Sequence, residues 1–221
     1  MKHLCLLLLP VTALLATSSA WSAPAADPAF DAGLLAIQQA WAHVNYEMPA
    51  GDARVREFEA LERRAEKFTH EHPGRAEALI WEGIVESSYA GAKGGLGALS
   101  LCKEAKGNLE AALAIDPKSL DGSAYTSLGT LYFKVPGFPL GFGNDDKAGQ
   151  LLRKALELNP NGIDPNYFYA EYLHDQDRDR EALQYLDRAA RAPARSGRET
   201  ADRGRQDEVV ALRRKLQGGA G

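Results

Sequence analysis

Apolar residues recur three or four positions apart along most of this chain, and that spacing places them on one face of an α-helix. The stretch from Tyr125 to Val135 contains several β-favouring residue types, but it keeps the helical register. Nowhere do alternating residues between turn signals form a convincing second candidate for a strand. The pattern therefore predicts an all-α fold.

Two parts of the chain repeat one another when they are aligned by their ends, Glu77 to Pro117 and Asp121 to Pro160. Both end in the same six-residue pattern: Ala-Leu, one variable residue, one apolar residue, Asp or Asn, and Pro. A third copy starts at Asp164-Pro165, a favourable helix start. The shared helical face of the first two copies consists of Ala105, Leu109 and Ala112, answered by Ala148, Leu152 and Ala155.

The upstream helix of the second copy contains an aromatic residue, a Leu-Gly pair and a tyrosine, at Tyr125, Leu128-Gly129 and Tyr132. Its downstream helix has alanine, a large apolar residue and alanine before the closing proline. This succession resembles the tetratricopeptide repeat, and the copies together cover residues 76–193. The resemblance implies a tetratricopeptide-like superhelix of antiparallel helix pairs with a concave groove.

The repeats are flanked and interrupted by other segments. Residues 26–75 predict a degenerate N-terminal helix pair, and residues 194–221 predict a C-terminal capping helix with a flexible tail. Extra residues in the first and second copies predict long inter-helix turns at 88–100 and 135–144, because both stretches are rich in glycine or proline.

The first 25 residues have the order of a secretory signal peptide: a positive charge at Lys2, a short apolar stretch and then small residues. Small side chains permit cleavage near residue 20 or near residue 25. Cleavage removes Cys5 and leaves Cys102 as the single thiol, so no intramolecular disulfide is expected. Cys102 lies in a helical pattern and is predicted to be a small buried hydrophobe. We expect a bacterial protein that is periplasmic or secreted.

Net charge and composition limit the kinds of partner that this protein can bind. The chain has 26 Lys and Arg against 30 Asp and Glu, a net charge of -4, so it lacks the basic field that holds nucleic acid. The tail from Arg191 onward is locally positive, as a solvated capping helix would be, or a surface for an acidic partner or an anionic membrane. Once the signal is removed, we expect no stable membrane insertion.

No catalytic or metal-binding constellation is recognisable. His70 and His72 stand two apart and would point away from each other on a helix, so no metal site is predicted. The glycine-rich stretch Gly91 to Gly97 lacks the context of a phosphate-binding loop. The acids Glu57, Glu59 and Glu62 are explained by a solvated helix face. The sequence therefore predicts a protein that is not an enzyme and uses no cofactor.

Aromatic and basic residues gather near the two predicted long turns. Phe138 and Phe142 lie in the Pro/Gly-rich turn, where they either line a ligand pocket or pack the loop down. Lysines near the turns are solvated by default but suit an acidic solute. The candidate ligand-binding or partner-binding residues are Tyr89, Lys93, Lys103, Tyr132, Lys134, Phe138, Phe142 and Asn144.

Two functions follow from the resemblance. The first is a periplasmic scaffold or adaptor that holds a protein or peptide partner in the concave groove, as tetratricopeptide proteins commonly do. The second is a ligand-binding component similar to the T component of tripartite (TRAP-type) periplasmic solute transporters, which would take a small acidic or apolar solute. The long turns and their aromatic residues favour this alternative.

Overall fold

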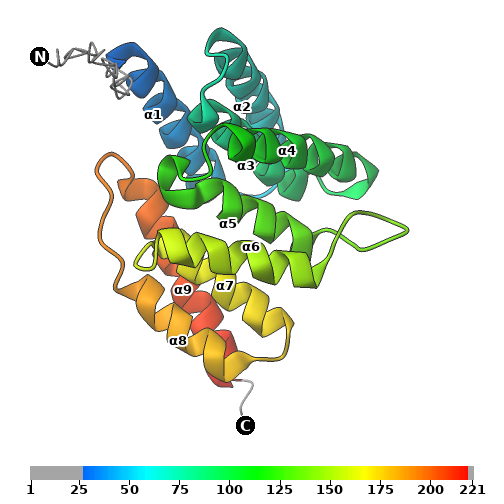
Figure 1. The fold of residues 1–221 in the computed structure, drawn as a ribbon, viewed down its shortest axis with the longest axis vertical. Coiled ribbons are helices and arrows are strands. Elements are labelled where there is room, and N and C mark those ends of the chain that lie inside the picture. Colours follow the sequence, from blue (N-terminus) through cyan, green and yellow to red (C-terminus); the bar gives the residue numbers. More distant parts are fainter. Residues whose placement is uncertain (1–26, 219–221) are drawn as a thin grey trace, which may run out of the picture.

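The computed structural model describes residues 27–218, which form α-helices, one short π-helix and no strand, so the predicted all-α class is confirmed (Figure 1). The predicted signal peptide and the last residues of the tail lie outside the described part. The elements are α1 (Pro28–Ala42), η1 (His43–Glu47), α2 (Asp52–Glu71), α3 (Ala76–Lys93), α4 (Gly95–Ile115), α5 (Ser119–Lys134), α6 (Asp145–Leu158), α7 (Ile163–Asp175), α8 (Asp179–Ala190) and α9 (Glu199–Gly218).

Consecutive helices pack as pairs, and two glycines set how closely the pairs approach. Gly83 on α3 lies against Leu109 of α4, where an added Cβ would come within 2.9 Å of the leucine Cγ. Gly129 on α5 lies in the same way against Leu152 of α6, at 2.8 Å. Both leucines are fully buried. Close packing of a glycine on one helix against a leucine on the next therefore joins the two helices in each of these pairs.

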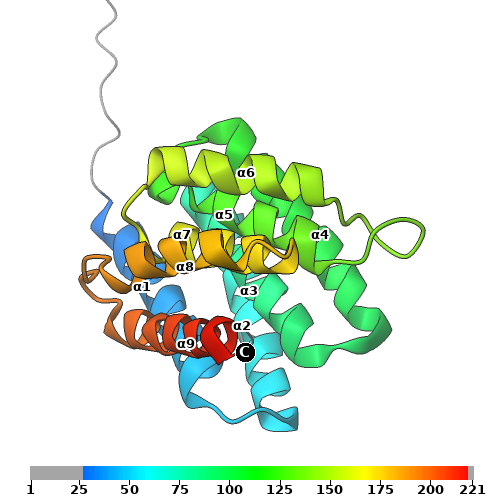
Figure 2. The ribbon, with the colours of Figure 1, turned by 90° about the horizontal axis from the view of Figure 1, so that it is seen from below.

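The odd-numbered helices form an inner layer that closes on itself. Contacts run from α1 to α3, α5, α7 and α9 in turn, and α9 also contacts α1 and η1 (Figure 2). The C-terminal helix packs on α7 and α8 at the end of the stack. In addition, it brings the two ends of the superhelix together. We call these five helices the inner ring.

The stretch 88–100, predicted to be a long turn, is helical instead. α3 continues to Lys93 and α4 begins at Gly95, so the chain reverses at Gly94. Gly94 and Gly95 both have positive φ, at 61° and 65°, which lets the reversal take place within two residues. The prediction was wrong because alanine-rich and leucine-rich flanks favour helix more than the intervening glycines oppose it.

The second stretch, 135–144, does form a turn, because Pro136 and Pro139 cannot continue a helix. The amide of Gly143 donates to the Pro136 carbonyl oxygen at 2.9 Å, which closes the base of the turn. Phe142 packs edge-on against Tyr132, with ring centroids 5.5 Å apart. Phe138 instead points into solvent and is 94% exposed.

The membrane-spanning potential of the helices and the environment of Cys102 can both be compared with the sequence-based expectations. Among the described residues, none of the helices has both the length and the apolar character needed to cross a membrane. Cys102 is half-buried and packs against both hydrophobic clusters of the molecule, and burial raises the pKa of its thiol.

Candidate binding pocket inside the inner ring

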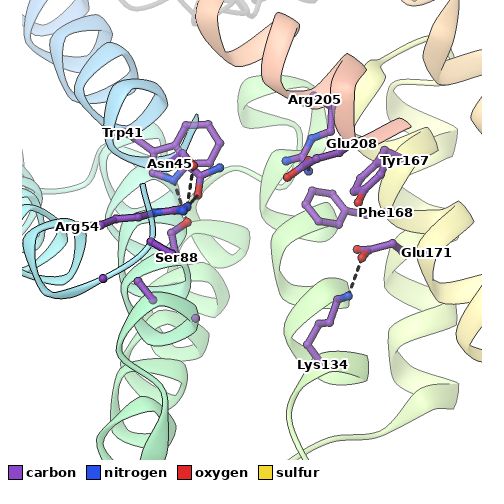
Figure 3. Close-up of a pocket in the computed structure, with 14 residues that line it drawn as sticks. Trp41, Asn45, Arg54, Ser88, Lys134, Tyr167, Phe168, Glu171, Arg205 and Glu208 are labelled. Carbon is purple, nitrogen blue, oxygen red and sulfur yellow. Dashed lines mark hydrogen bonds and ion pairs between the residues drawn. The ribbon is translucent and has the colours of Figure 1, made fainter. Parts of the chain in front are cut away.

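A half-open pocket of about 520 Å³ lies within the inner ring, between two walls (Figure 3). One wall comes from α1, η1, α2 and α3, and we call it the N-terminal wall. The other comes from α5, α7 and α9, and we call it the C-terminal wall. The lining residues are Trp41, Asn45, Ala50, Gly51, Arg54, Ser88, Gly91, Ala92, Lys134, Tyr167, Phe168, Glu171, Arg205 and Glu208.

The N-terminal wall is held together by hydrogen bonds. The indole Nε1 of Trp41 donates to Ser88 Oγ at 2.8 Å, and Ser88 Oγ donates to a main-chain carbonyl of its own helix at 2.9 Å. Arg54 Nη2 donates to the Asn45 carbonyl oxygen at 2.7 Å and to its Oδ1 at 3.2 Å. Asn45 belongs to the π-helix η1, whose wide turn is a common feature of functional sites.

The charge of Arg54 has no carboxylate partner within residues 27–218. Its recorded hydrogen bonds both come from Nη2 and both go to Asn45. Nε is buried without any acceptor among the described residues. The side chain as a whole remains half-buried. Arg54 is therefore a fixed positive charge at the pocket with donors to spare.

The C-terminal wall is fully paired. Lys134 Nζ lies 2.7 Å from Glu171 Oε1. The Arg205 guanidinium lies over the rings of Tyr167 and Phe168, at 4.7 Å and 4.4 Å from their centroids, and forms an ion pair with Glu208. Cation–π contact of this kind is strongest when water is excluded. Only 7% of Arg205 is exposed.

Arg205 also connects α9 to the start of α7 through Asp164. Its Nε lies 2.8 Å from Asp164 Oδ1, and Arg195 Nη1 lies 2.7 Å from Asp164 Oδ2. Burial by itself would raise the pKa of Asp164, but Arg205 and Arg195 outweigh burial and lower it to about 2. The carboxylate is thus charged at physiological pH and holds the C-terminal helix in place.

A close contact completes the ring on the other side of α9. Gly204 lies directly against the ring of Tyr46, where an added Cβ would overlap the ring atoms. Tyr46 OH donates to Glu208 at 3.5 Å, and burial is the main reason that the pKa of Tyr46 is raised. Arg203 adds an ion pair to Glu47 at 3.3 Å. Glycine at 204 is what lets α9 approach η1.

Of the residues proposed from sequence, Lys134 lines this pocket. Tyr89 is buried and accepts a hydrogen bond from Lys93 at 3.2 Å, and Lys103 is exposed. The remaining candidates surround the turn at 135–144: Tyr132 accepts from Lys147 at 2.6 Å, Phe142 packs on Tyr132, Phe138 is exposed, and Asn144 caps α6 through the Lys147 amide at 2.8 Å.

Sequence reasoning missed most of the lining. Tyr167 and Phe168 were not among the candidates, and Arg205 was seen only as part of a locally positive tail. Arg54 carried no signal at all, because its isolation from acids is visible only in three dimensions. Tyr167 belongs to the larger hydrophobic cluster and Phe168 packs against it, so their aromatic character alone did not mark them as pocket residues.

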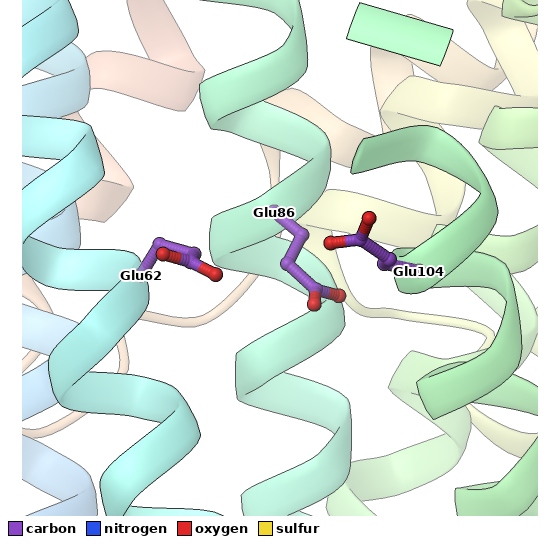
Figure 4. A group of neighbouring side chains, drawn as sticks. All are labelled: Glu62, Glu86 and Glu104. Carbon is purple, nitrogen blue, oxygen red and sulfur yellow. The ribbon is translucent and has the colours of Figure 1, made fainter. Parts of the chain in front are cut away.

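A separate group of acids comes from α2, α3 and α4 (Figure 4). Glu62, Glu86 and Glu104 bring carboxylate oxygens within 4.8 Å of one another. Burial first, and then neighbouring acids, raise the pKa of Glu86 to about 8, although Asn108 donates to its carboxylate and opposes the shift. Such oxygens are the ligands that hard divalent cations prefer. Glu62 was expected on a solvated helix face, but it is half-buried and lies beside two other carboxylates.

Comparison with known proteins gives the fold. No protein family matches the sequence, and no curated protein resembles it closely enough to count as a relative. Among solved structures, a thermophilic tetratricopeptide protein of Thermus thermophilus is similar over 86% of this chain and 91% of its own, with a TM-score of 0.55 and 20% identity. The fold is that of a tetratricopeptide-repeat protein. At this identity the likeness establishes the fold and nothing about function.

Two other tetratricopeptide-like structures are similar at lower scores. MamA has a TM-score of 0.43 with 19% identity over 73% of this chain and 88% of its own. PilF of Pseudomonas aeruginosa has a TM-score of 0.36 with 16% identity over 87% of this chain and 95% of its own.

Proposed function

We propose that this protein is an exported tetratricopeptide scaffold without catalytic activity, which holds a segment of a protein partner in the inner-ring pocket. The observation that carries the proposal is the closure of the ring by α9. Closure turns an open concave face into a pocket with two facing walls. The likeness to tetratricopeptide structures supports a general role for this protein in protein–protein interaction.

The composition of the walls suits a protein partner. Trp41, Tyr167, Arg54 and Arg205 belong to the residue types that contribute most to binding energy at protein interfaces. Rigid aromatic side chains offer contact area at low entropic cost, and the held guanidinium of Arg54 offers directed donors. The lining thus resembles an interface anchor pocket more than a reaction centre.

The absence of catalysis rests on the chemistry of the lining. Ser88 is its only hydroxyl nucleophile of the serine or threonine type, and that hydroxyl already donates to a main-chain carbonyl. No histidine or cysteine belongs to the lining. A nucleophile without a base at hydrogen-bonding distance is not activated.

Export rests on the order of charge, apolar and small residues in positions 1–25. We expect the protein isolated from a periplasmic fraction to begin near residue 21 or residue 26. N-terminal sequencing of that fraction tests this. Full-length protein confined to the cytoplasm would contradict export without touching the proposed pocket.

Site-specific photo-crosslinking in the native cell tests the partner. A benzophenone amino acid at Ala50, an exposed lining residue, is expected to give one defined protein adduct. The same group at Lys154, on the outer-layer helix α6, is the matched control and is expected to give none. Equal adducts from both positions, or none from Ala50, would overturn the proposal.

A second function, the ligand-binding component of a solute transporter, is favoured by pocket size. A volume of about 520 Å³ falls within the roughly 300–1,000 Å³ typical of small-molecule sites. Native mass spectrometry of the protein purified from its own periplasm separates the two functions. A small bound mass, together with no adduct at Ala50, would favour the carrier.

A further inference from the structure

We propose that the inner-ring pocket binds a carboxylate at Arg54, with the apolar body of the ligand lying between Trp41 and the rings of Tyr167 and Phe168. The inference rests on the proposed pocket and names the chemistry of its occupant. It adds a specific anchoring residue that the sequence does not single out.

The charged side chains that line the pocket do not balance one another. Arg54, Lys134 and Arg205 face Glu171 and Glu208, which leaves one positive charge in excess. On the C-terminal wall both cations already have carboxylates, at 2.7 Å for Lys134 and in direct contact for Arg205. The excess charge therefore resides on Arg54, and an anion is the ligand group that balances it.

The geometry of Arg54 is that of a prepared donor. Asn45 holds Nη2 through two oxygens, so the guanidinium is oriented before any ligand arrives. Nη1 has no hydrogen bond to any of the residues the structure describes, and it is available to donate. Prior orientation lowers the entropic cost of binding, and a guanidinium–carboxylate hydrogen bond is among the stronger kinds.

A single negative charge fits better than a phosphate. Glu171 and Glu208 line the facing wall. A dianion would balance Arg54 with one charge and bring its second charge toward these acids, which costs energy in a partly desolvated site. The aromatic side chains on both walls add apolar contact. The occupant is thus a monocarboxylate with an aromatic or branched apolar body, either a free organic acid or the C-terminal residue of a peptide.

The test uses isothermal titration calorimetry on the whole mature chain with two probes. N-acetylphenylalanine carries the carboxylate, and N-acetylphenylalanine amide has the same body without the charge. The unaltered protein is expected to bind the acid more tightly than the amide, because the amide cannot accept the charge-assisted hydrogen bond.

Variants at Arg54 assign the effect. Arg54→Gln is expected to weaken binding of the acid by about 10- to 100-fold, the equivalent of one charge-assisted hydrogen bond. Binding of the amide should be unchanged, and Arg54→Lys should restore part of the loss. Arg64→Gln is the matched control, since Arg64 is exposed on the same helix and outside the pocket. Equal affinities for acid and amide, or equal losses in the two glutamine variants, would overturn the inference.

Two further arms identify the source of the carboxylate and separate this inference from the proposed function. Tighter binding of a four-residue peptide ending in phenylalanine than of the free acid identifies a protein C-terminus, and equal affinity identifies a free acid. Arg54-dependent binding without an adduct at Ala50 supports the carboxylate site and rejects the protein scaffold. A defined adduct at Ala50 that survives Arg54→Gln, with no binding of either probe, rejects the carboxylate site alone.

Discussion

Two arginines face the same pocket from opposite walls, and their surroundings differ in almost every respect. Arg205 is 7% exposed, forms ion pairs with Asp164 and Glu208, and is covered by two aromatic rings. Arg54 is half-buried, donates its hydrogen bonds only to the main-chain and amide oxygens of Asn45, lies over the ring of Phe58, and has no ion pair in the described chain. The first joins elements of the fold, and the second leaves its charge open to a ligand.

The difference follows from solvation. A charge withdrawn from water must be compensated by hydrogen bonds and opposite charge, or it destabilises the fold. Arg205 receives that compensation from Asp164 and the aromatic rings of α7 and from Glu208 on its own helix. Arg54 keeps part of its hydration and needs less. The two residues should therefore respond to mutation in opposite ways, one through stability and the other through binding.

Removal of the Arg205 charge has the largest expected effect. Arg205→Met leaves Asp164 and Glu208 without their main partner and should lower the free energy of unfolding by about 3–5 kcal/mol. Chemical denaturation measures the change. Arg214→Met, an exposed position on the same helix, should change stability by less than about 0.5 kcal/mol. Similar losses in both variants would show that Arg205 is not the structural charge.

The next effect concerns a buried acid behind the N-terminal wall. The pKa of Glu86 is raised from 4.5 to about 8, so the folded state holds a proton that the unfolded state releases. Its contribution is favourable below pH 4.5, and the free energy of unfolding should fall as pH rises from about 4.5 to about 8, by on the order of 3 kcal/mol.

Glu86→Gln should remove this pH dependence and raise stability at pH 8, since Asn108 can still donate to the amide oxygen. Urea denaturation at several pH values measures it. Glu59→Gln, at an exposed position on α2, should leave the slope between pH 5 and pH 8 as it is. An unchanged slope in Glu86→Gln would mean that Glu86 titrates normally.

A smaller effect is expected where α9 meets η1. Gly204→Ala places a methyl group on the ring of Tyr46 and should cost about 1–3 kcal/mol, the usual cost of overpacking. Gly107 on α4 has open space around it, so Gly107→Ala is the matched control and should stabilise slightly. Thermal unfolding compares them. Equal melting temperatures would contradict the close contact of α9 with η1.

The smallest stability effect is expected at Arg54 itself. Arg54→Gln should change the free energy of unfolding by less than about 1 kcal/mol, because glutamine can still donate to Asn45 and no acid loses its partner. The same denaturation experiment measures it. A loss as large as that of Arg205→Met would mean that Arg54 is structural, and the contrast between the walls would disappear.

The helix pairs could be predicted from sequence, because each depends on local spacing. Gly83 and Gly129 recur at one repeat position, and their leucine partners recur with them. The stretch 88–100 was wrongly predicted as a long turn, because glycine is compatible with both a turn and a helix end. Pro136, in contrast, excludes helix, and the turn at 135–144 was predicted correctly for that reason.

The pocket could not be predicted in the same way. Whether α9 reaches α1 depends on small rotations summed over all the repeats, and no local pattern records that sum. Arg205 follows the repeats by sequence and meets Asp164 because α9 folds back on α7. The candidate lysines and aromatic residues were chosen because they lie near the turns, whereas much of the lining comes from η1 and the start of α2, and from α7 and α9.

Closure of the ring is the central claim, and the distance between α9 and η1 tests it most directly. Spin labels at the exposed positions of His43→Cys and Ala211→Cys, in a chain carrying Cys102→Ala, report that distance by pulsed electron resonance. The closed ring predicts a single short and narrow distance distribution. A long or broad distribution, with helical content unchanged, would contradict closure and with it the pocket.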